Sequence, residues 1–129
     1  MPKGEQTVLS ETGFLVSETD EKGYILFAND EFCKVAEYSL DDLIGKPHNI
    51  VRHPDMPKVA FKDLWDTIRA GKVWQGFVKN STSSGGYYWV FATVYPYKNK
   101  QGEQCYLSVR RKPSQEDIDK HEALYKTMH

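Results

Sequence analysis

Apolar and polar residues alternate with a period of two through most of the second half of the chain. The alternation covers residues 73–81, 87–97 and 103–112. Because side chains of a β-strand point alternately to the two faces of a sheet, this pattern predicts three long strands. Linkers rich in Ser, Gly and Asn separate them, which is typical of hairpins. We therefore expect an antiparallel meander here.

The segment before the meander has the period of a helix. Its apolar side chains recur at intervals of three and four residues, and they are Phe61, Leu64, Trp65 and Ile68. Pro57 suits the first turn of such a helix, and Gly71 suits its end. This is the clearest helix that the sequence predicts.

Shorter elements come first in the chain. Residues 14–19 and 24–28 predict two strands joined by a polar turn at 20–23. Asn29 and Ser39 are suited to cap the two short helices that follow. A hairpin therefore precedes a small helical region.

The last segment predicts another helix. Ser114 and Asp117 form a capping-box pattern, and Ile118 and Tyr125 lie on one side of the helix with Met128. This gives the helix an apolar face that must contact something.

Together these elements predict an α+β fold, with one five-stranded antiparallel sheet and short helices packed on one face. We divide the chain into an N-terminal cap segment at 1–12, a main domain at 13–112 and a C-terminal amphipathic helix at 113–129.

Composition narrows the class of protein. The chain has 129 residues, a formal net charge of −1 and 40% hydrophobic residues, which suits one globular domain and no bulk attraction to nucleic acid. No apolar run reaches the length of a membrane span and the N-terminus lacks a signal-peptide core, so we expect a cytoplasmic protein. Cys33, Cys105 and the four histidines show no metal or redox spacing.

Candidate chemistry is concentrated in residues 48–57, HNIVRHPDMP. Prolines at 54 and 57 bias their neighbours toward extended conformations, so we expect a stiffened loop that is neither helix nor strand. Rigid charged loops commonly bind ligands. The alternative is structural: Pro57 begins the following helix, and Asp55 lies near its positive end.

Alternation also assigns one side of each long strand to a pocket. The assigned residues are Trp74, Gly76, Val78 and Asn80, then Tyr88, Val90, Ala92 and Val94, then Tyr106, Ser108 and Arg110. A pocket floor of Asn80, Ser108 and Arg110 among apolar walls suits a flat heteroaromatic ligand with polar edges. The opposite side of the sheet carries Phe77, Trp89, Phe91, Tyr95 and Leu107. So many large apolar side chains require a cover: the N-terminal segment around Val8 and Leu9, the last helix, or a second copy of the chain.

The loop string carries a resemblance to a known family. With Phe61, Trp65, WQG at 74–76, VKN at 78–80 and YYWV at 87–90, it resembles the PAS sensor domain of bacterial aerotaxis (energy-taxis) receptors. The similarity extends from about Thr19 to about Arg110. It implies a PAS fold whose pocket lies between the helices and the sheet.

The resemblance also implies FAD as the cofactor. Residues equivalent to Arg52, His53, Asp55, Trp74 and Asn80 are associated with holding FAD in that family. To this expected set we add Arg110, Trp65 and His48. Arg52 offers a planar fork suited to a pyrophosphate or to an anionic reduced flavin. The structural alternatives are an Arg52–Asp55 loop pair, a core role for Trp74 and a strand-end cap at Asn80.

The function implied is an FAD-binding redox sensor in aerotaxis, not an enzyme. The chain has no Gly-rich nucleotide fingerprint and no obvious acid–base pair. The position of the reactive cysteine of LOV photoreceptors falls near His48, so photochemistry of that type is not expected. A haem-binding gas sensor and a ligand-free PAS interaction module remain the alternatives.

Expected partners follow from the same resemblance. They are a homodimer formed through the outer sheet face or the N-terminal segment, and a HAMP or methyl-accepting signalling domain in the same or a separate protein. Whether this chain is a stand-alone protein or one domain of a longer receptor stays open.

Overall fold

The computed structural model describes residues 6, 7, 9 and 13–128. The strands are β1 (Leu15–Asp20), β2 (Ile25–Ala28), β3 (Trp74–Ser81), β4 (Tyr87–Lys98) and β5 (Gln104–Arg111). The helices are α1 (Asp30–Ala36), α2 (Leu40–Leu43), the 3₁₀ turn η1 (His48–Val51), α3 (Lys58–Arg69) and α4 (Gln115–Tyr125). No helix among these residues is both long enough and apolar enough to cross a membrane.

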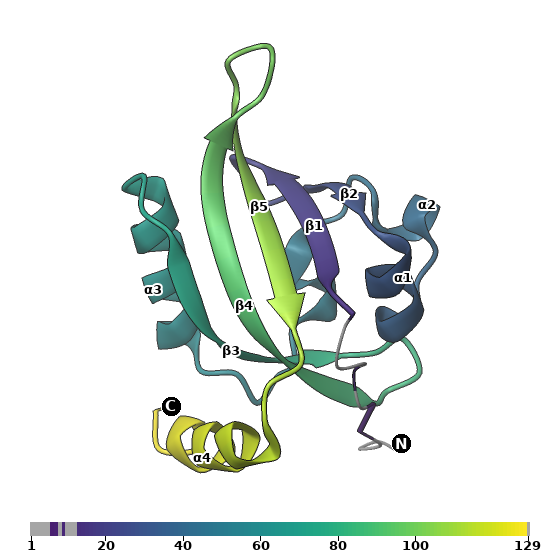
Figure 1. Ribbon diagram of the computed structural model, residues 1–129, viewed down its shortest axis with the longest axis vertical. Helices are drawn as coiled ribbons and strands as arrows, with labels where there is room; N and C mark the ends of the chain where they lie inside the picture. The colour runs from purple at the N-terminus through teal and green to yellow at the C-terminus, as the bar shows by residue number, and fades with distance from the viewer. Residues whose placement is uncertain (1–5, 8, 10–12, 129) are drawn as a thin grey trace.

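All five strands form one antiparallel sheet in the order β2-β1-β5-β4-β3 (Figure 1). The first strand pairs with the last, so that Leu15 lies opposite Arg110 and Ser17 opposite Ser108. The predicted α+β fold, with a five-stranded antiparallel sheet, is confirmed. The inner face of the sheet packs against α3, where Trp65 meets Tyr106 edge to face at 5.7 Å.

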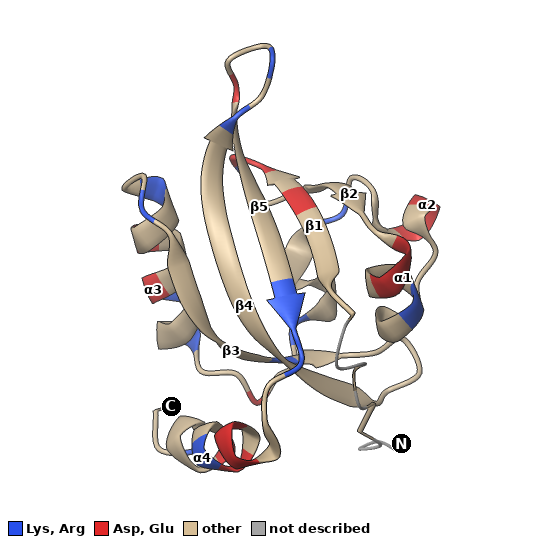
Figure 2. Cartoon of the chain, in the orientation of Figure 1, with Lys and Arg blue, Asp and Glu red and all other residues tan. Residues whose placement is uncertain are grey.

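Short polar side chains fix where the small helices begin. Asn29 caps α1 by accepting from the backbone N–H of Phe32 at 3.0 Å, and the same oxygen accepts from Val16 N–H in β1 at 3.1 Å. Ser39 and Ser114 cap α2 and α4 as predicted. Acidic residues follow these caps (Figure 2), where they interact favourably with the helix dipole.

The charged loop, residues 48–57, differs from the prediction in one respect. Residues His48–Val51 form a 3₁₀ turn, although we expected no helix there. The prolines at 54 and 57 restrict only themselves and the residue before each, so they leave this turn free to form. Pro57 occupies the N-cap position of α3, as expected. Gly71, with φ +84°, follows the end of the helix, also as expected.

The outer face of the sheet is covered in part by α4. Tyr125 stacks on Trp89 with ring centroids 6.0 Å apart, and His121 lies 4.2 Å from the ring of Phe77. Leu9 is buried, and Val8 lies outside the described residues. The last helix was one of the predicted covers, and the structure confirms it.

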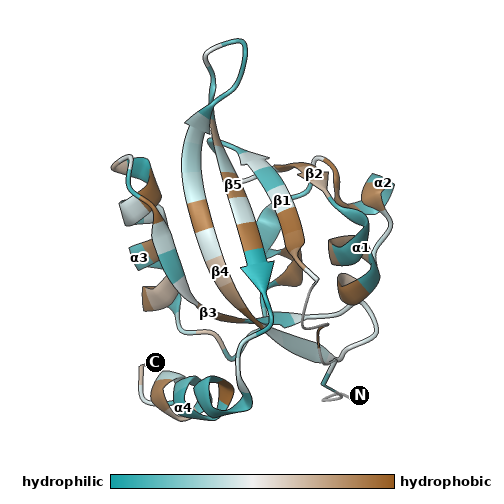
Figure 3. Ribbon diagram, in the orientation of Figure 1, coloured by the Kyte–Doolittle hydropathy of each residue, from teal (hydrophilic) through white to brown (hydrophobic). Residues whose placement is uncertain are grey.

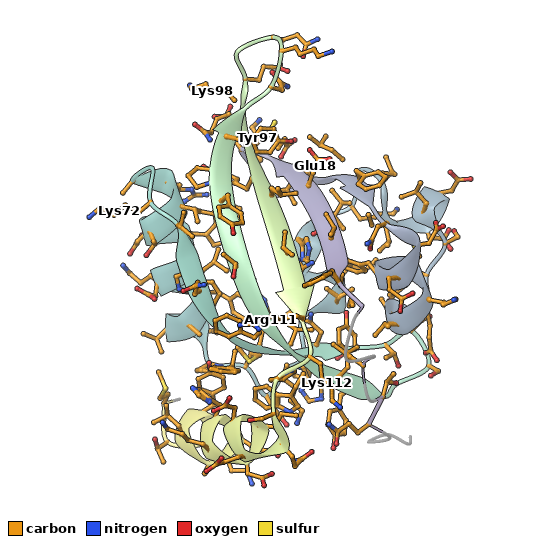
Figure 4. All side chains as sticks on the ribbon, in the orientation of Figure 1. Glu18, Lys72, Tyr97, Lys98, Arg111 and Lys112 are labelled. Atoms are coloured by element: carbon orange, nitrogen blue, oxygen red, sulfur yellow. The ribbon has the colours of Figure 1, made fainter. Side chains whose placement is uncertain are left out.

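The rest of the outer face is open. Figure 3 shows apolar positions along β1, β4 and β5, and Tyr95 is 41% exposed. Near that end of the sheet, the hydroxyl of Tyr97 donates to the Glu18 carboxylate (Figure 4). Burial and this carboxylate raise the pKa of Tyr97, so its phenol remains protonated. The open part is therefore mixed apolar and polar.

Gly76 makes room for the ring of Trp74 on the inner face. A Cβ at residue 76 would lie 2.4 Å from that ring. The Gly76→Ala variant should therefore displace the indole and break its 2.9 Å hydrogen bond to Asp63. We expect the free energy of unfolding to fall by about 1–3 kcal/mol in urea titrations. In a Trp74→Leu background the same change should cost much less; an equal cost would mean that the indole is not the obstacle.

Candidate ligand-binding site

A cavity of about 260 Å³ lies between the inner face of the sheet, α3 and η1. The strands contribute Val78, Asn80, Ala92, Val94, Tyr106, Ser108 and Arg110 to its lining. Helix α3 contributes Phe61, Leu64, Trp65 and Ile68. The alternation therefore assigned these strand residues to the correct face.

Arg110 is the charged residue on the cavity floor, and only 5% of it is exposed. Its Nη2 donates to the Ser17 hydroxyl at 3.1 Å and lies 2.7 Å from Nε2 of His48. The ring of Phe32 packs 5.0 Å from its Cζ. Its Nη1 is buried without a hydrogen-bond partner in the described part of the chain. One terminal nitrogen of this buried cation is therefore not used by the described residues.

His48 is held neutral beside this cation. Burial, reinforced by the charge of Arg110, lowers the pKa of His48 to about 3. Because a guanidinium can only donate hydrogen bonds, Nε2 must be the unprotonated nitrogen that accepts from Arg110. Burial also lowers the pKa of Arg110, to about 10, so the guanidinium stays charged at neutral pH.

The mouth of the cavity is cationic. Arg52 pairs with Asn80 through an isolated β-bridge, and its guanidinium lies 3.9 Å from the ring centroid of Phe61. Two further exposed cations line the cavity, Lys22 and Arg69. Such a rim favours an anionic group on the ligand.

His53 and Asp55 do not line the cavity, although we expected both to hold the ligand. The chain crosses the edge of β3 after Arg52, and His53 N–H donates to the Lys79 carbonyl at 3.4 Å. The imidazole then lies edge-on to Tyr87, and the Asp55 carboxylate lies 3.0 Å from Nζ of Lys79. The loop is thus divided between the two faces of the sheet.

Trp74 and Asn80 behave differently from each other. Trp74 is on the inner face, but its indole donates to Asp63 instead of lining the cavity. Asn80 does line the cavity, and its amide nitrogen lies 3.5 Å from the hydroxyl of Tyr88. The hydroxyl of Ser108 is buried without a partner among the described residues, which makes it a second polar group available there.

Several residues of the site were missing from the sequence prediction. Ser17 contacts both Arg110 and His48 beneath the cavity floor, and Thr19, Lys22 and Arg69 line the cavity itself. The alternation of β1 could have identified Ser17 and Thr19, since both are buried on the face that carries Leu15. Nothing in the sequence pattern marks Lys22 or Arg69.

Comparison with known proteins gives a consistent result. A family model described as PAS fold matches residues 25–110. The chain is 44% identical over 124 residues to the aerotaxis receptor of Escherichia coli, covering 96% of this chain and 24% of the receptor. It is 29% identical over 106 residues to the nitrogen fixation regulatory protein of Klebsiella oxytoca, covering 81% of this chain and 21% of that protein. The chain thus spans about a quarter or less of these relatives.

Solved structures share the fold. The dark structure of the LOV domain of the blue-light photoreceptor aureochrome superposes with a TM-score of 0.71 at 20% identity, covering 86% of each chain. A PAS domain from Colwellia psychrerythraea gives a TM-score of 0.69 at 19% identity, covering 78% of this chain and 86% of that one. At this identity the likeness concerns the fold.

The neutral state of His48 predicts a pH dependence of stability. A folded pKa of about 3 lies below the unfolded value of about 6.5, so the unfolded state binds more protons between them and stability falls as the pH falls. From pH 7 to pH 5 the wild type should lose about 2 kcal/mol more than His48→Gln, whose amide oxygen can still accept from Arg110. Urea titrations at both pH values measure this difference. An identical pH response in the two proteins would show that His48 is protonated as easily when folded as when unfolded.

Proposed function

The chain belongs to the PAS family of sensory domains, and from this premise we propose that it binds FAD and reports redox state in aerotaxis (energy-taxis) signalling. The observation that carries the proposal is the floor of the cavity. There the free donor of Arg110 and the hydroxyl of Ser108 stand among apolar walls. Such a floor suits a flat heteroaromatic ring with polar atoms on one edge.

The residues present fit a flavin nucleotide. The cavity, about 260 Å³, is slightly smaller than the ~300–1,000 Å³ usual for ligand pockets, which suits the ring system but not a whole dinucleotide. Arg110, Ser108 and Asn80 would hold the polar edge of the ring. The phosphates would lie at the mouth, where Arg52 supplies a planar fork of donors and Lys22 and Arg69 add positive charge.

A bound flavin supplies a ring system that accepts electrons and changes charge on reduction. The protein supplies the electrostatics around it. Arg110 favours negative charge near the floor, because the buried guanidinium is poorly solvated. Neutral His48 accepts from Arg110 without adding a charge of its own. Change at the ring can then be transmitted to the surface of the domain.

Relatives support this assignment. The Escherichia coli protein named as an aerotaxis receptor is similar to nearly the whole chain. Among solved structures, one with a TM-score of 0.71 concerns a flavin analogue in a light-oxygen-voltage domain. Cys33 and Cys105 are not among the residues that line the cavity, so we do not propose a photochemical cysteine adduct.

A haem sensor is less well supported. His48 is the histidine that lines the cavity, and its Nε2 already faces Arg110 and Ser17. Serving as an axial ligand would require His48 to give up both contacts. A ligand-free interaction module would make no use of Nη1 of Arg110, which is buried and has no hydrogen-bond partner among the described residues.

The proposed partners are a second copy of the chain and a HAMP or methyl-accepting signalling domain, either in the same protein or in a separate one. The open part of the outer sheet face around Tyr95 is a surface on which such a partner could pack. We place the domain in the cytoplasm, where a redox signal from respiration is accessible to it.

The purified protein should be yellow and should release FAD on denaturation. Arg52→Ala should weaken FAD binding about tenfold to hundredfold, since hydrogen bonds to a charged group are worth about 1.5–3 kcal/mol. His53→Ala is the matched control from the same loop, and its effect should be much smaller because His53 lies outside the cavity. Flavin fluorescence titration of the flavin-free protein measures both. A colourless protein that takes up no added flavin would exclude the proposed function.

Arg110→Gln should make the flavin midpoint potential more negative. Losing about 1.5–3 kcal/mol of preference for the reduced state corresponds to about 30–60 mV for a two-electron couple. Arg69→Gln is the control at the mouth, and it should shift the potential much less because its charge is exposed to solvent. Equal shifts in the two variants during spectroscopic redox titration would argue against a special role for the floor.

A further inference from the structure

We infer that Lys79 is a positioning residue that links ligand binding in the cavity to the docking of α4 on the opposite face of the sheet. The link consists of two ion pairs, one to Asp55 in the charged loop and one to Glu122 in α4. This inference rests on the proposed function for the identity of the ligand.

Lys79 is a buried cation held by two separate segments. Only 6% of the residue is exposed. Its Nζ lies 3.0 Å from the Asp55 carboxylate, 3.3 Å from the Glu122 carboxylate and 4.6 Å from the ring centroid of Tyr87. Removing one partner from a buried charge is strongly unfavourable, because the charge cannot recover its hydration. A movement of the loop that takes Asp55 away therefore removes one of the two ion-pair partners of Lys79.

The same loop is attached to the cavity. Arg52 forms its β-bridge with Asn80, and both residues line the cavity. His53 follows Arg52 in the loop, and Lys79 precedes Asn80 in the antiparallel strand β3. His53 N–H bonds to the Lys79 carbonyl, and Lys79 N–H lies 3.3 Å from the sulfur of Met56. The loop and the strand therefore lie side by side. Arg52 and Asn80 face the cavity, and the neighbouring residue of each segment, His53 or Lys79, faces the outer side of the sheet.

The packing of α4 against the sheet leaves some space unfilled. A void of about 110 Å³ remains between the charged loop, the sheet and α4. The indole N–H of Trp89, which borders this void, is buried without an acceptor among the described residues. Helix α4 is also attached by the Tyr125 hydroxyl, which donates to the Phe77 carbonyl at 2.6 Å, and by the stacking of Tyr125 on Trp89. The ion pair between Glu122 and Lys79 adds the contact that connects this attachment to the charged loop.

Whether the ligand strengthens or weakens the docking of α4 depends on how it changes the order of the loop. A ligand that contacts Arg52 and Asn80 restrains the loop, which keeps Asp55 beside Lys79. Docking α4 on a loop that is already ordered then costs less entropy, so ligand binding strengthens docking. By thermodynamic reciprocity, weakening the ion pairs lowers the affinity of the cavity for the ligand.

Hydrogen–deuterium exchange of the amides in α4 tests the inference, with and without saturating FMN or FAD. In the full wild-type chain, flavin should slow exchange in α4 at least about fivefold, the lower end of usual coupling between sites. In Asp55→Asn, α4 should exchange faster without flavin and should no longer respond to flavin. Asp119→Asn also removes one negative charge, but from an exposed position of α4, and this variant should behave like the wild type.

The outcomes separate this inference from the proposed function. If Asp55→Asn leaves exchange in flavin-free α4 unchanged, or if α4 still responds to flavin in this variant, Lys79 does not form the link. If no variant binds flavin but Asp55→Asn and Glu122→Gln both accelerate exchange in α4, the ion-pair link holds and the proposed ligand is wrong. A response of Asp119→Asn as large as that of Asp55→Asn would reduce the effect to general charge and overturn the inference.

Discussion

Arg110 places a full positive charge on the buried floor of the cavity, and no ion pair within the described residues neutralises it. Neutral side chains around the guanidinium stabilise its charge. The Ser17 hydroxyl and the neutral ring of His48 accept from one nitrogen, and the face of Phe32 lies beside the guanidinium. The other nitrogen has no partner among them. The inner face therefore retains hydrogen-bonding capacity that the described residues do not use.

The edge of β3 separates two environments that the charged loop connects. On the inner side, Arg52 and Asn80 line the cavity. On the outer side, Lys79 contacts both Asp55 and Glu122 of α4. A strand is well suited to this division, because neighbouring side chains point to opposite faces. In this arrangement, a ligand and a helix that never touch can act on adjacent residues of one strand.

Sequence periodicity predicted most of the fold, because each long strand has one buried face and α3 has one apolar side. It also identified Asn80, Ser108 and Arg110 as inward residues. It could not show that His53 and Asp55 lie outside the cavity, because the point where the loop crosses the sheet edge depends on the bridge between Arg52 and Asn80, which is not local in sequence. It missed Arg69 for a related reason: an exposed arginine at the end of a helix carries no periodic signal.

The pairing of β1 with β5 has a consequence for how the protein is made. Ser17, His48 and Arg110 meet at the cavity floor, and Ser17 and Arg110 are separated by 93 residues in the chain. The ribosome must therefore complete β5 before the floor can exist. Non-local pairing of this kind also slows folding, because the loop must close before the contacts form. The cavity floor, and any ligand contact with it, can therefore form only after β5 has been synthesised and has paired with β1.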